Sequence, residues 1–386
     1  TAKRHVLWEF TEEDDGTTGN SDLGFSYSKP SIVMTNIESS GEKRWAAIFG
    51  NGYNSTSSDG DSAIYIVFID GGLDGTWSSN DFVKLTTSYG KAESNDNNTP
   101  NGMGTPRVID SDGNGTADYI YSGDMQGNLY RFDISTSTTT NWTSSSNQKV
   151  LFQAKDKTNN TQPITIQPMV VQHPTKDGFV VVASTGSWIT TSDAINTDIQ
   201  SIYGIWDDLS SSPLVTRSQL VEQTFYNVTK SDVSPSVTTR VLTSNTITWN
   251  NDSSAKIKGW HIDLDVAIEG SNTVEAPGER ATQVKKFGDL AFINTVLPKD
   301  ATSCKGAEGG WLLFFNPKTG AGPSSVVLDL NKDGDFDSDD AVTLDIDGSG
   351  AIEIAPSGKK FNEAPGLTSI NGGSAVTQTS DAKITV

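Results

Sequence analysis

The sequence is poor in cysteine and histidine, and each shortage excludes a class of site. Its 386 residues include one cysteine, Cys304, so neither an internal disulfide nor a multi-cysteine zinc site can form. The three histidines, His5, His173 and His261, lie far apart, and no Gly-x-Ser-x-Gly motif accompanies them. We therefore expect structural roles for the histidines and predict that the protein is not an enzyme.

Basic residues are also few. The chain has 28 Lys and Arg against 48 Asp and Glu, which gives a formal net charge of −20. Such a surface repels phosphate groups, so direct nucleic-acid binding is not expected. No apolar run approaches the roughly 20 residues of a membrane-spanning helix, and no span is predicted. An acidic chain suits a medium containing calcium, because bound cations offset repulsion between carboxylates.

Long helical periodicity is missing as well. Short runs of β-branched and aromatic residues recur instead, separated by clusters of Gly, Asn, Asp and Ser, and this pattern indicates an all-β fold. Examples of these runs are residues 45–49, 63–69, 119–121, 129–134, 179–183, 290–293 and 311–315.

A weak internal repeat organises these runs. Its landmark is a strand that ends in an aromatic residue followed by an acid or amide. The landmark recurs roughly every 50–75 residues, at Glu9, Asp70, Asp133, Asp207, Asp263 and Asn316. Units of this size predict the blades of a β-propeller, in which neighbouring sheets cover each other's faces. We expect a single modified β-propeller domain over residues 1–386, with six or seven blades and seven favoured.

Two details of the ring follow from the same pattern. The strand that reaches Asp133 carries apolar residues on both faces, as a blade packed between two neighbours requires, and we take it as the last strand of its unit. The opening run, residues 6–10, has the landmark without the rest of a blade. It is expected to close the ring by pairing with C-terminal strands, which removes open sheet edges.

The most specific motif is an acidic loop at residues 110–118. Oxygen-bearing side chains stand at its positions 1, 3, 5 and 9, glycine stands at position 6, and position 7 offers its carbonyl. Calcium takes roughly six to eight oxygen ligands, and alternate residues of a tight loop supply them. We therefore predict a Ca²⁺ ion held by Asp110, Asp112, Asn114, Thr116 and Asp118.

The same spacing returns near the C-terminus, with Gly334 at position 6. It predicts a second Ca²⁺ ion, and Asp340 at position 12 is a candidate further ligand. The surrounding residues 324–360 are expected to form a calcium-binding hairpin insertion. The predicted ligands of the second loop are Asp329, Asn331, Asp333, Asp335 and Asp337.

A third stretch, residues 345–353, repeats the pattern with a weaker ligand. Asp345, Asp347, Ser349 and Glu353 stand at positions 1, 3, 5 and 9, but serine is a poorer calcium ligand than a carboxylate. The stretch is either a third calcium loop or an acidic turn that lends a ligand to the second.

Several segments carry a combination of motifs, including Phe-Gly-Asn-Gly at residues 49–52 and Gly-Asp-Met-Gln-Gly-Asn at residues 123–128. Together they resemble the C-terminal domain of the PilY/PilC/ComC family. The segments that carry the resemblance are residues 6–10, 29–33, 49–55, 110–118, 123–133, 202–207, 259–264 and 278–280.

The resemblance implies a modified β-propeller that belongs to a type IV pilus tip adhesin and biogenesis factor. It implies a calcium loop at Asp110, Asp112, Asn114, Thr116 and Asp118 that is linked to pilus extension and retraction. It further implies support for adhesion, twitching motility and, in some members, DNA uptake. Expected partners are minor pilins, the pilus tip complex and a host-cell or abiotic surface. The expected location is the extracellular pilus tip or outer membrane surface of a Gram-negative bacterium.

Two alternatives remain open at this point. A quinoprotein-like dehydrogenase shares a propeller with calcium, but such enzymes carry an adjacent cysteine pair that Cys304 alone cannot supply. A carbohydrate-binding propeller is the other alternative, since the chain has 9 Trp and 9 Tyr that could stack on sugars. An integrin-binding version has no support, because no Arg-Gly-Asp triplet occurs.

Overall fold

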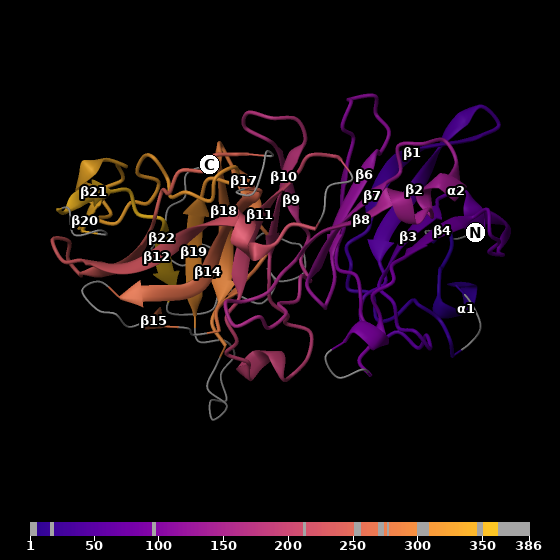
Figure 1. Ribbon diagram of the computed structural model, residues 1–386, viewed down its shortest axis with the longest axis horizontal. Coiled ribbons are helices and arrows are strands. Elements are labelled where there is room, and N and C mark those ends of the chain that lie inside the picture. The colour runs from indigo at the N-terminus through magenta and orange to yellow at the C-terminus, as the bar shows by residue number, and fades with distance from the viewer. Residues whose placement is uncertain are drawn as a thin grey trace, which may run out of the picture. The chain divides into compact units, whose positions relative to one another are not determined.

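The computed structural model describes residues 6–15, 19–94, 98–210, 214–250, 256–268, 274–275, 278–298, 309–345 and 350–361. The chain divides into two compact units, one comprising Thr1–Pro168 with Ser210–Val215 and the other Met169–Leu209 with Thr216–Val386. Strands dominate both units (Figure 1). Within the described ranges the α-helices are α1 (Glu12–Asp15) and α2 (Thr139–Trp142), and no helix there is long and apolar enough to cross a membrane.

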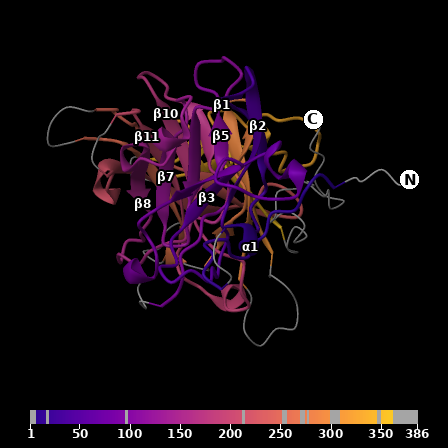
Figure 2. The ribbon, with the colours of Figure 1, turned by 90° about the vertical axis from the view of Figure 1, so that its right-hand side faces the viewer.

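The first unit contains two four-stranded antiparallel sheets, each with its strands in chain order. Hydrogen-bonded neighbours are therefore also neighbours in sequence, which is the arrangement of a propeller blade. Figure 2 views these strands from the side that lies on the right in Figure 1. The strands of one sheet are β1 (Ser31–Ser39), β2 (Glu42–Gly50), β3 (Ala63–Phe68) and β4 (Phe82–Thr86). Those of the other are β5 (Arg107–Ile109), β6 (Tyr119–Gly123), β7 (Asn128–Asp133) and β8 (Gln148–Gln153).

In both sheets the aromatic landmark marks the third strand. Phe68 ends β3, and Phe132 lies at the end of β7. The prediction that the strand reaching Asp133 is the last of its unit was therefore wrong by one strand. The fourth strands were missed because most of their residues are partly exposed, in alternation in β4 and at both ends of β8, so their apolar pattern is weaker.

Strand β3 is buried on both faces. Ile64 and Ile66 contribute to a core that also contains residues of the second sheet of the unit, such as Phe132. Tyr65 and Val67 contribute to a separate cluster on the opposite face. Alternate residues of a strand point to opposite faces, so a run of six buried residues requires cover on both sides.

The opening run covers that second face of β3. Trp8 Nε1 donates to Ile69 O at 2.9 Å, and the ring centroids of Phe10 and Tyr65 lie 5.7 Å apart. Residues 6–10, all described by the structure, form no strand there. The predicted pairing of this run with C-terminal strands was therefore wrong. Its aromatic side chains bury their area by packing on the face of a sheet, which needs no ladder hydrogen bonds.

The second unit has a continuous sheet in place of separate ones. Its strands pair in the order β16-β18-β19-β22-β13-β12-β14-β11-β10-β9, with β15 beside β14 and β17 beside β18. All neighbours are antiparallel except β12 and β14, which are parallel. The strands are β9 (Met169–Gln172), β10 (Phe179–Ser184), β11 (Ser201–Asp207), β12 (Leu220–Lys230), β13 (Val237–Leu242), β14 (Gly259–Ile268), β15 (Val274–Glu275), β16 (Arg280–Ala281), β17 (Lys285–Phe287), β18 (Leu290–Val296), β19 (Gly310–Phe315) and β22 (Gly358–Phe361).

The core of this sheet is built around Trp260. Its ring lies so close to Gly204 on the neighbouring strand that a Cβ at residue 204 would fall 2.1 Å from Trp260 Cε2. Phe315 contacts the same tryptophan edge-on, with ring centroids 5.6 Å apart. The glycine is therefore required by close packing between strands.

A two-stranded hairpin, β20 (Val342–Leu344) and β21 (Ile352–Ile354), follows the second acidic loop. Leu328 and Leu330 precede the hairpin, and they share with Val342 and Leu344 a buried cluster that includes residues of β12, β13 and β19. The acidic loop thus begins and ends at residues packed on the sheet of the second unit.

Candidate functional site

The first predicted calcium loop, residues 110–118, joins β5 to β6. Asp118 N donates to Ile109 O at 2.9 Å and closes the loop at its base. Gly113 and Gly115 have φ angles of +78° and +89°, in the left-handed region that other residues rarely adopt. These two glycines allow the chain to coil tightly between the strands.

Backbone N–H groups of the loop hold its carboxylates in place. Asp110 accepts from Gly113 N through Oδ1 and from Gly115 N through Oδ2, both at 2.7 Å. Asp112 Oδ1 accepts from Asn114 N at 3.0 Å. The hydrogen bond from Gly115 N is the main cause that holds the pKa of Asp110 below its ordinary value, so this side chain is charged at neutral pH.

The carboxylates of Asp110, Asp112 and Asp118 come together in this loop. Each offers an oxygen within 4.8 Å of the oxygens of the other two. Asp118 is only 4% exposed, and its Oδ2 accepts from Ser111 N at 2.8 Å and from Ser111 Oγ at 2.7 Å. A set of oxygen donors this close together fits calcium, which binds its ligands at about 2.3–2.6 Å.

The remaining predicted ligands tie the loop to a neighbouring sheet. Asn114 Oδ1 accepts from Thr116 N at 2.8 Å, and Thr116 Oγ1 donates to Asn36 Oδ1 on β1 at 2.9 Å. Ala117 N donates to Met34 O at 2.9 Å, and Asn36 Nδ2 donates to Ala117 O at 3.2 Å. Any stiffening of the loop would therefore reach β1, which belongs to the other sheet of the first unit.

The second predicted loop, residues 329–337, repeats the hydrogen bonds and the backbone conformation of the first loop at positions 4 and 6. Asp329 Oδ1 accepts from Lys332 N at 2.6 Å, and its Oδ2 accepts from Gly334 N at 3.1 Å. These donors stand at positions 4 and 6, as Gly113 and Gly115 do in the first loop. The φ angles of Lys332 and Gly334 are +68° and +94°, so both again adopt the left-handed region.

The other predicted ligands of the second loop also accept local N–H groups. Asn331 Oδ1 accepts from Asp333 N at 3.0 Å, and Asp333 Oδ1 accepts from Asp335 N at 2.8 Å. Asp337 Oδ1 accepts from Asp339 N at 2.8 Å. Among the described side chains, however, the groups of three with ligand atoms within 4.8 Å of one another do not include this loop. The structure thus gathers the first set of carboxylates more closely than the second.

The third stretch is only partly described. Asp345 and Glu353 fall within the described residues, whereas Asp347 and Ser349 lie outside them. The choice between a third calcium loop and an acidic turn therefore stays a prediction.

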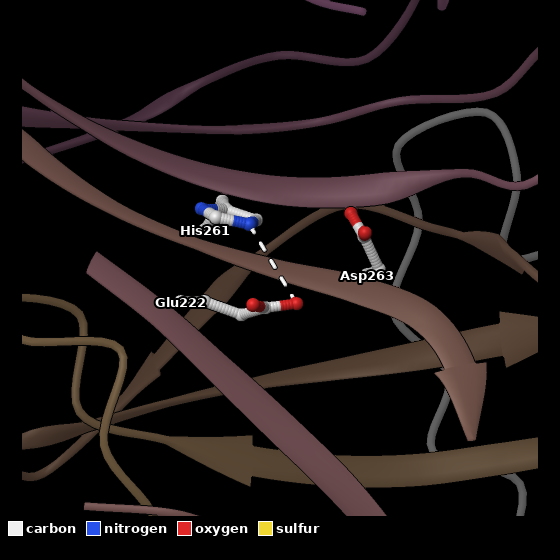
Figure 3. Close-up of side chains that lie close together, drawn as sticks. All are labelled: Glu222, His261 and Asp263. Carbon is white, nitrogen blue, oxygen red and sulfur yellow. Dashed lines mark ion pairs between the residues drawn. The ribbon is translucent and has the colours of Figure 1, made fainter. Parts of the chain in front are cut away.

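A further group of ligand-type side chains lies in the second unit (Figure 3). Glu222 is on β12, while His261 and Asp263 are on β14, and the parallel pairing of these strands places Glu222 opposite His261. His261 Nε2 lies 4.0 Å from Glu222 Oε1. The sequence held no local signal for this group, because pairing between distant strands creates it.

Arg217 makes this group a poor metal site. Its Nη2 lies 2.6 Å from Asp263 Oδ2, and Ser201 Oγ donates to Asp263 Oδ1 at 2.7 Å. Burial, together with the charge of Arg217, lowers the pKa of His261 to about 4. Arg217 already neutralises the carboxylate of Asp263. This geometry supports the structural role expected for His261.

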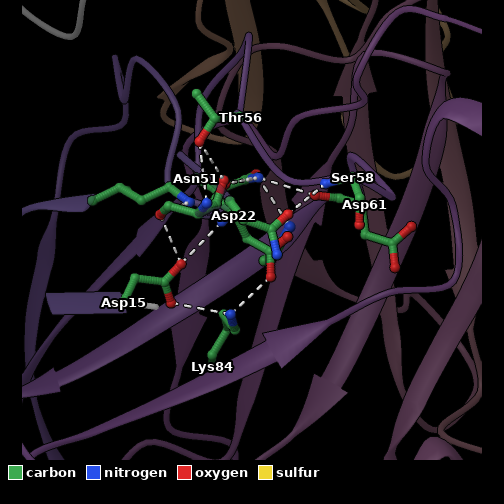
Figure 4. Close-up of polar contacts among 11 residues, drawn as sticks. Asp15, Asp22, Asn51, Thr56, Ser58, Asp61 and Lys84 are labelled. Carbon is green, nitrogen blue, oxygen red and sulfur yellow. Dashed lines mark hydrogen bonds and ion pairs between the residues drawn. The ribbon is translucent and has the colours of Figure 1, made fainter. Parts of the chain in front are cut away.

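A polar cluster anchors the N-terminal segment of the first unit (Figure 4). Lys84 Nζ on β4 lies 3.1 Å from Asp15 Oδ1 and 2.7 Å from Asp22 Oδ2. Asn51 Nδ2 donates to the backbone oxygens of Asp22 and Asp61 at 2.8 and 3.1 Å. Burial, and then the charges of nearby acids, raise the pKa of Asp61 to about 6. This cluster contains its own cation, Lys84, and it serves as an anchor.

Another acid, Asp124, holds the Gly-Asp-Met-Gln-Gly-Asn turn together. It is 0% exposed, and its Oδ1 accepts from Gln126 N at 3.0 Å and Asn128 N at 2.8 Å. Its Oδ2 accepts from Asn101 Nδ2 at 2.8 Å, Asn128 Nδ2 at 2.9 Å and Tyr130 OH at 2.9 Å. The turn is one of the motifs noted in the sequence. In the structure, the carboxylate of Asp124 accepts the hydrogen bonds that hold it together.

Known proteins resemble this chain in sequence and in fold. The chain is similar to the type IV pilus biogenesis factor PilY1 of Pseudomonas aeruginosa, with 29% identity over 361 residues. The match covers 86% of this chain and 28% of that protein, so the chain spans just over a quarter of its relative. A PilY1 homologue from Xylella fastidiosa is 29% identical over 333 residues, which are 82% of this chain and 20% of the relative.

A solved structure agrees with these matches. The crystal structure of the Pseudomonas aeruginosa PilY1 C-terminal domain has a TM-score of 0.70 and 28% identity, and the match covers 92% of this chain and 69% of that one. The model of the PilY1 β-propeller domain family matches residues 1–236. The predicted fold class, an all-β modified propeller, is thereby confirmed, while the number of blades stays a prediction. On these grounds the chain belongs to the PilY1 β-propeller domain family.

Proposed function

We propose that this chain is a non-enzymatic, calcium-binding part of a type IV pilus, at the extracellular pilus tip or outer membrane surface of a Gram-negative bacterium. Its family supports the pilus role, as do relatives that are named type IV pilus biogenesis factors rather than enzymes. The observation that carries the calcium proposal is the convergence of Asp110, Asp112 and Asp118 within one short loop.

Two loops would each hold one Ca²⁺ ion. The first would use the side chains of Asp110, Asp112, Asn114 and Asp118 with the carbonyl of Thr116. The second would use the side chains of Asp329, Asn331, Asp333 and Asp337 with the carbonyl of Asp335. The support for the second is that its first residue accepts N–H groups from the same two positions as Asp110 does.

The physical effect of the ion is ligand linkage. Calcium binds the ordered loop better than an unfolded one, so it stabilises the folded chain by RT ln(1 + [Ca²⁺]/Kd). At tenfold excess over Kd this amounts to about 1.4 kcal/mol, which suits a local switch more than the folding of the whole chain. The bonds from Thr116 and Ala117 to β1 would carry the stiffening into the neighbouring sheet.

In the pilus, this switch would bias the balance between extension and retraction. Minor pilins and the pilus tip complex are the proposed partners within the fibre, and a host-cell or abiotic surface is the proposed target outside it. Adhesion and twitching motility would then depend on calcium, and DNA uptake would be affected through the pilus. The net charge of −20 argues against contact between this chain and DNA.

Calorimetry on the chelator-treated protein tests the calcium proposal. Two ions should bind, and Asp110→Ala should abolish or strongly weaken one of them because it removes the first ligand of the loop. In cells, the same change in the full-length protein should alter piliation and twitching while leaving the level of folded protein unchanged.

Asp74→Asn is the matched control. Asp74 is also an exposed aspartate that accepts a backbone N–H, from Thr76 at 2.9 Å, but no second carboxylate joins it in the described groups of three. It should leave both binding events intact. Absence of calcium binding to the wild-type protein at millimolar calcium would refute the proposal.

A further inference from the structure

A groove at one end of the β1–β4 sheet gathers exposed apolar side chains. Its volume is about 340 Å³, and the apolar residues that line it are Leu7, Trp45, Ile69 and Leu73. Leu7 is 67% exposed, Trp45 is 52% exposed and Leu73 is 59% exposed. Single exposed apolar residues are ordinary, but several of them gathered within a polar rim mark an interaction site.

The packing of the first unit leaves the tryptophan of this groove half uncovered. Side chains alternate between the two faces of β2, so Trp45 lies on the same face as Phe49. Phe49 packs on the cluster that Trp8 and Phe10 of the opening run cover. Leu7, next to Trp8 in the chain, lines the groove instead. An indole ring is therefore presented to the solvent beside aliphatic side chains.

The two basic residues that line the groove are both paired within the chain. Arg44 Nη2 lies 2.8 Å from Asp70 Oδ1, and Arg44 Nη1 donates to Asn80 O at 2.8 Å. Lys43 Nζ lies 2.9 Å from Glu38 Oε1. The positive charges of the rim are thus already engaged by acids of this protein.

Glu42 supplies a carboxylate that is not paired in this way. It lines the groove and is exposed, and its side chain makes no ion pair or hydrogen bond with another residue that the structure describes. The groove and its ion-pair partners hold three acids against two bases, which leaves one net negative charge. This charge lies on a chain whose formal net charge is −20, so the groove favours a cation.

We propose that this groove binds a segment of a partner protein in which a lysine or arginine lies beside apolar side chains. The apolar side chains bury against Trp45 and Leu73. The cationic head lies at Glu42 and over the face of the indole, to which a cation is attracted. Because the stem of a lysine or arginine is itself apolar, one such residue contacts both parts of the groove. No residue of either acidic loop takes part, so this binding is independent of calcium.

The composition of the groove favours a protein segment over other ligands. A sugar could stack on Trp45, but its hydroxyl groups need several hydrogen-bond partners. Besides the ion-paired residues and the indole N–H, the lining offers only Ser39 and Glu42 for this purpose. A phosphate or other anion would meet the free carboxylate of Glu42. Tryptophan and apolar groups inside a charged rim are typical of protein interfaces.

The size of the groove suits an anchor within a larger interface. Pockets of about 300–1,000 Å³ hold small ligands, so this groove accommodates one or two side chains. Stable interfaces between proteins bury roughly 1,200–2,000 Å². We therefore expect short peptides to bind here more weakly than the whole partner, but with the same preference for a basic residue beside apolar ones.

Selection of a phage-displayed library of random short peptides against the full chain tests the proposal. The selected peptides should carry a lysine or arginine next to an apolar residue, and calorimetry with synthetic copies should give their affinity. Trp45→Ala should weaken them at least about tenfold, because tryptophan anchors contribute strongly to interfaces. Leu73→Ala, which removes a second exposed side chain of the groove, should weaken them about threefold whether or not Trp45→Ala folds.

Charge variants test the role of Glu42. Glu42→Gln should weaken the peptides by roughly threefold, and Glu42→Lys by roughly tenfold because it repels their cation. Glu13→Gln is the matched control, since it removes the same charge from an exposed glutamate of this unit that does not line the groove. It should change the affinity by less than about twofold. Equal weakening by Glu13→Gln and Glu42→Gln would overturn the inference.

Three further results would overturn it. The first is a selection that yields no peptide whose binding depends on Trp45 or Leu73. The second is a set of selected peptides that are acidic or uncharged. The third is a neutral glycan on an array that binds the wild type but not Trp45→Ala, which would assign the groove to sugars.

Discussion

Two fully buried acids, one in each unit, are accommodated by different means. In the first unit, Asp124 is fully buried and accepts hydrogen bonds from neutral groups, among them Asn101 Nδ2 and Asn128 Nδ2. In the second unit, Glu279 is fully buried with an oxygen 2.7 Å from Arg240 Nη2. Neutral donors surround the charge of Asp124, whereas an opposite charge neutralises that of Glu279.

Each way of burying an acid has its own cost in stability. Burial raises the pKa of Asp124, although the hydrogen bonds from Asn128 oppose this shift. An ion pair avoids that problem but leaves an unpaired charge in the core if either partner is lost. We therefore expect the loss of Glu279 to destabilise the protein more than the loss of Asp124.

The largest effect is expected from Glu279→Ala. It leaves the guanidinium of Arg240 buried. A hydrogen bond from its Nε to Asn227 Oδ1 at 3.2 Å and the ring of Trp311, 4.0 Å from its Cζ, compensate only in part. The free energy of unfolding should fall by about 3–5 kcal/mol, measured by urea denaturation. A loss below about 1 kcal/mol would contradict the importance of this pair.

Asp124→Ala should cost somewhat less. Among the donors to Asp124, Gln126 N retains Asn101 Oδ1 as an acceptor and Asn101 Nδ2 retains Tyr89 O. The backbone N–H and side chain of Asn128 and the hydroxyl of Tyr130 lose this acceptor at about 1 kcal/mol each, so the free energy of unfolding should fall by about 3 kcal/mol. Urea denaturation again gives the value. If this variant proves more destabilised than Glu279→Ala, the contrast between the two units is reversed.

Asp61→Asn should stabilise the first unit, and only at neutral pH. The folded-state pKa of Asp61 is raised to about 6 from 3.8, so ionisation penalises the folded state as pH rises through this range. Removing the charge should add about 1 kcal/mol at pH 7.5, after allowance for solvent screening of a half-buried group. The gain should vanish below about pH 4, as thermal midpoints measured against pH would show.

The exposed neighbour Asp59 gives the control for that prediction. Asp59→Asn removes one acid close to Asp61 without removing the half-buried charge. It should reproduce only a small part of the gain. A benefit of Asp61→Asn that is equal at pH 4 and pH 7.5 would mean that the effect is not electrostatic.

The smallest effect sharpens the comparison between the two predicted calcium loops. Lys332 adopts a φ of +68°, where Gly113 of the first loop has +78°. Lys332→Gly should raise the free energy of unfolding by about 0.5 kcal/mol, because relief of left-handed strain slightly exceeds the entropy cost of glycine. Thermal unfolding in calcium would measure it, and Gly113→Ala should have the opposite sign.

Much of the candidate site could be read from the sequence because it is local. The spacing of Asp110, Asp112, Asn114 and Asp118 predicted a loop whose carboxylates converge, and three of them do lie together. The hydrogen bonds that arrange them span five residues or fewer, apart from that between Asp118 and Ser111. Local chain geometry is enough to produce such an arrangement.

The rest required contacts between distant residues. The fourth strand of each sheet in the first unit was missed because more than half of its residues are partly exposed. The group of Glu222, His261 and Asp263 exists only because β12 and β14 pair in parallel. No periodicity in the sequence encodes which distant strands become neighbours.

By itself, the sequence determined three features of this protein: an excess of acidic residues, loops with oxygen-bearing side chains at alternate positions, and strands that need cover on both faces. Only the tertiary structure decided which residues cover each face of a strand. It placed Trp8 and Phe10 on β3, gave Asp124 its donors and set Glu279 against Arg240. The physical reason is the separation in sequence of the residues that make contact. Turns and acidic loops form between neighbours in the chain, whereas burial and ion pairs depend on how distant segments pack in the core.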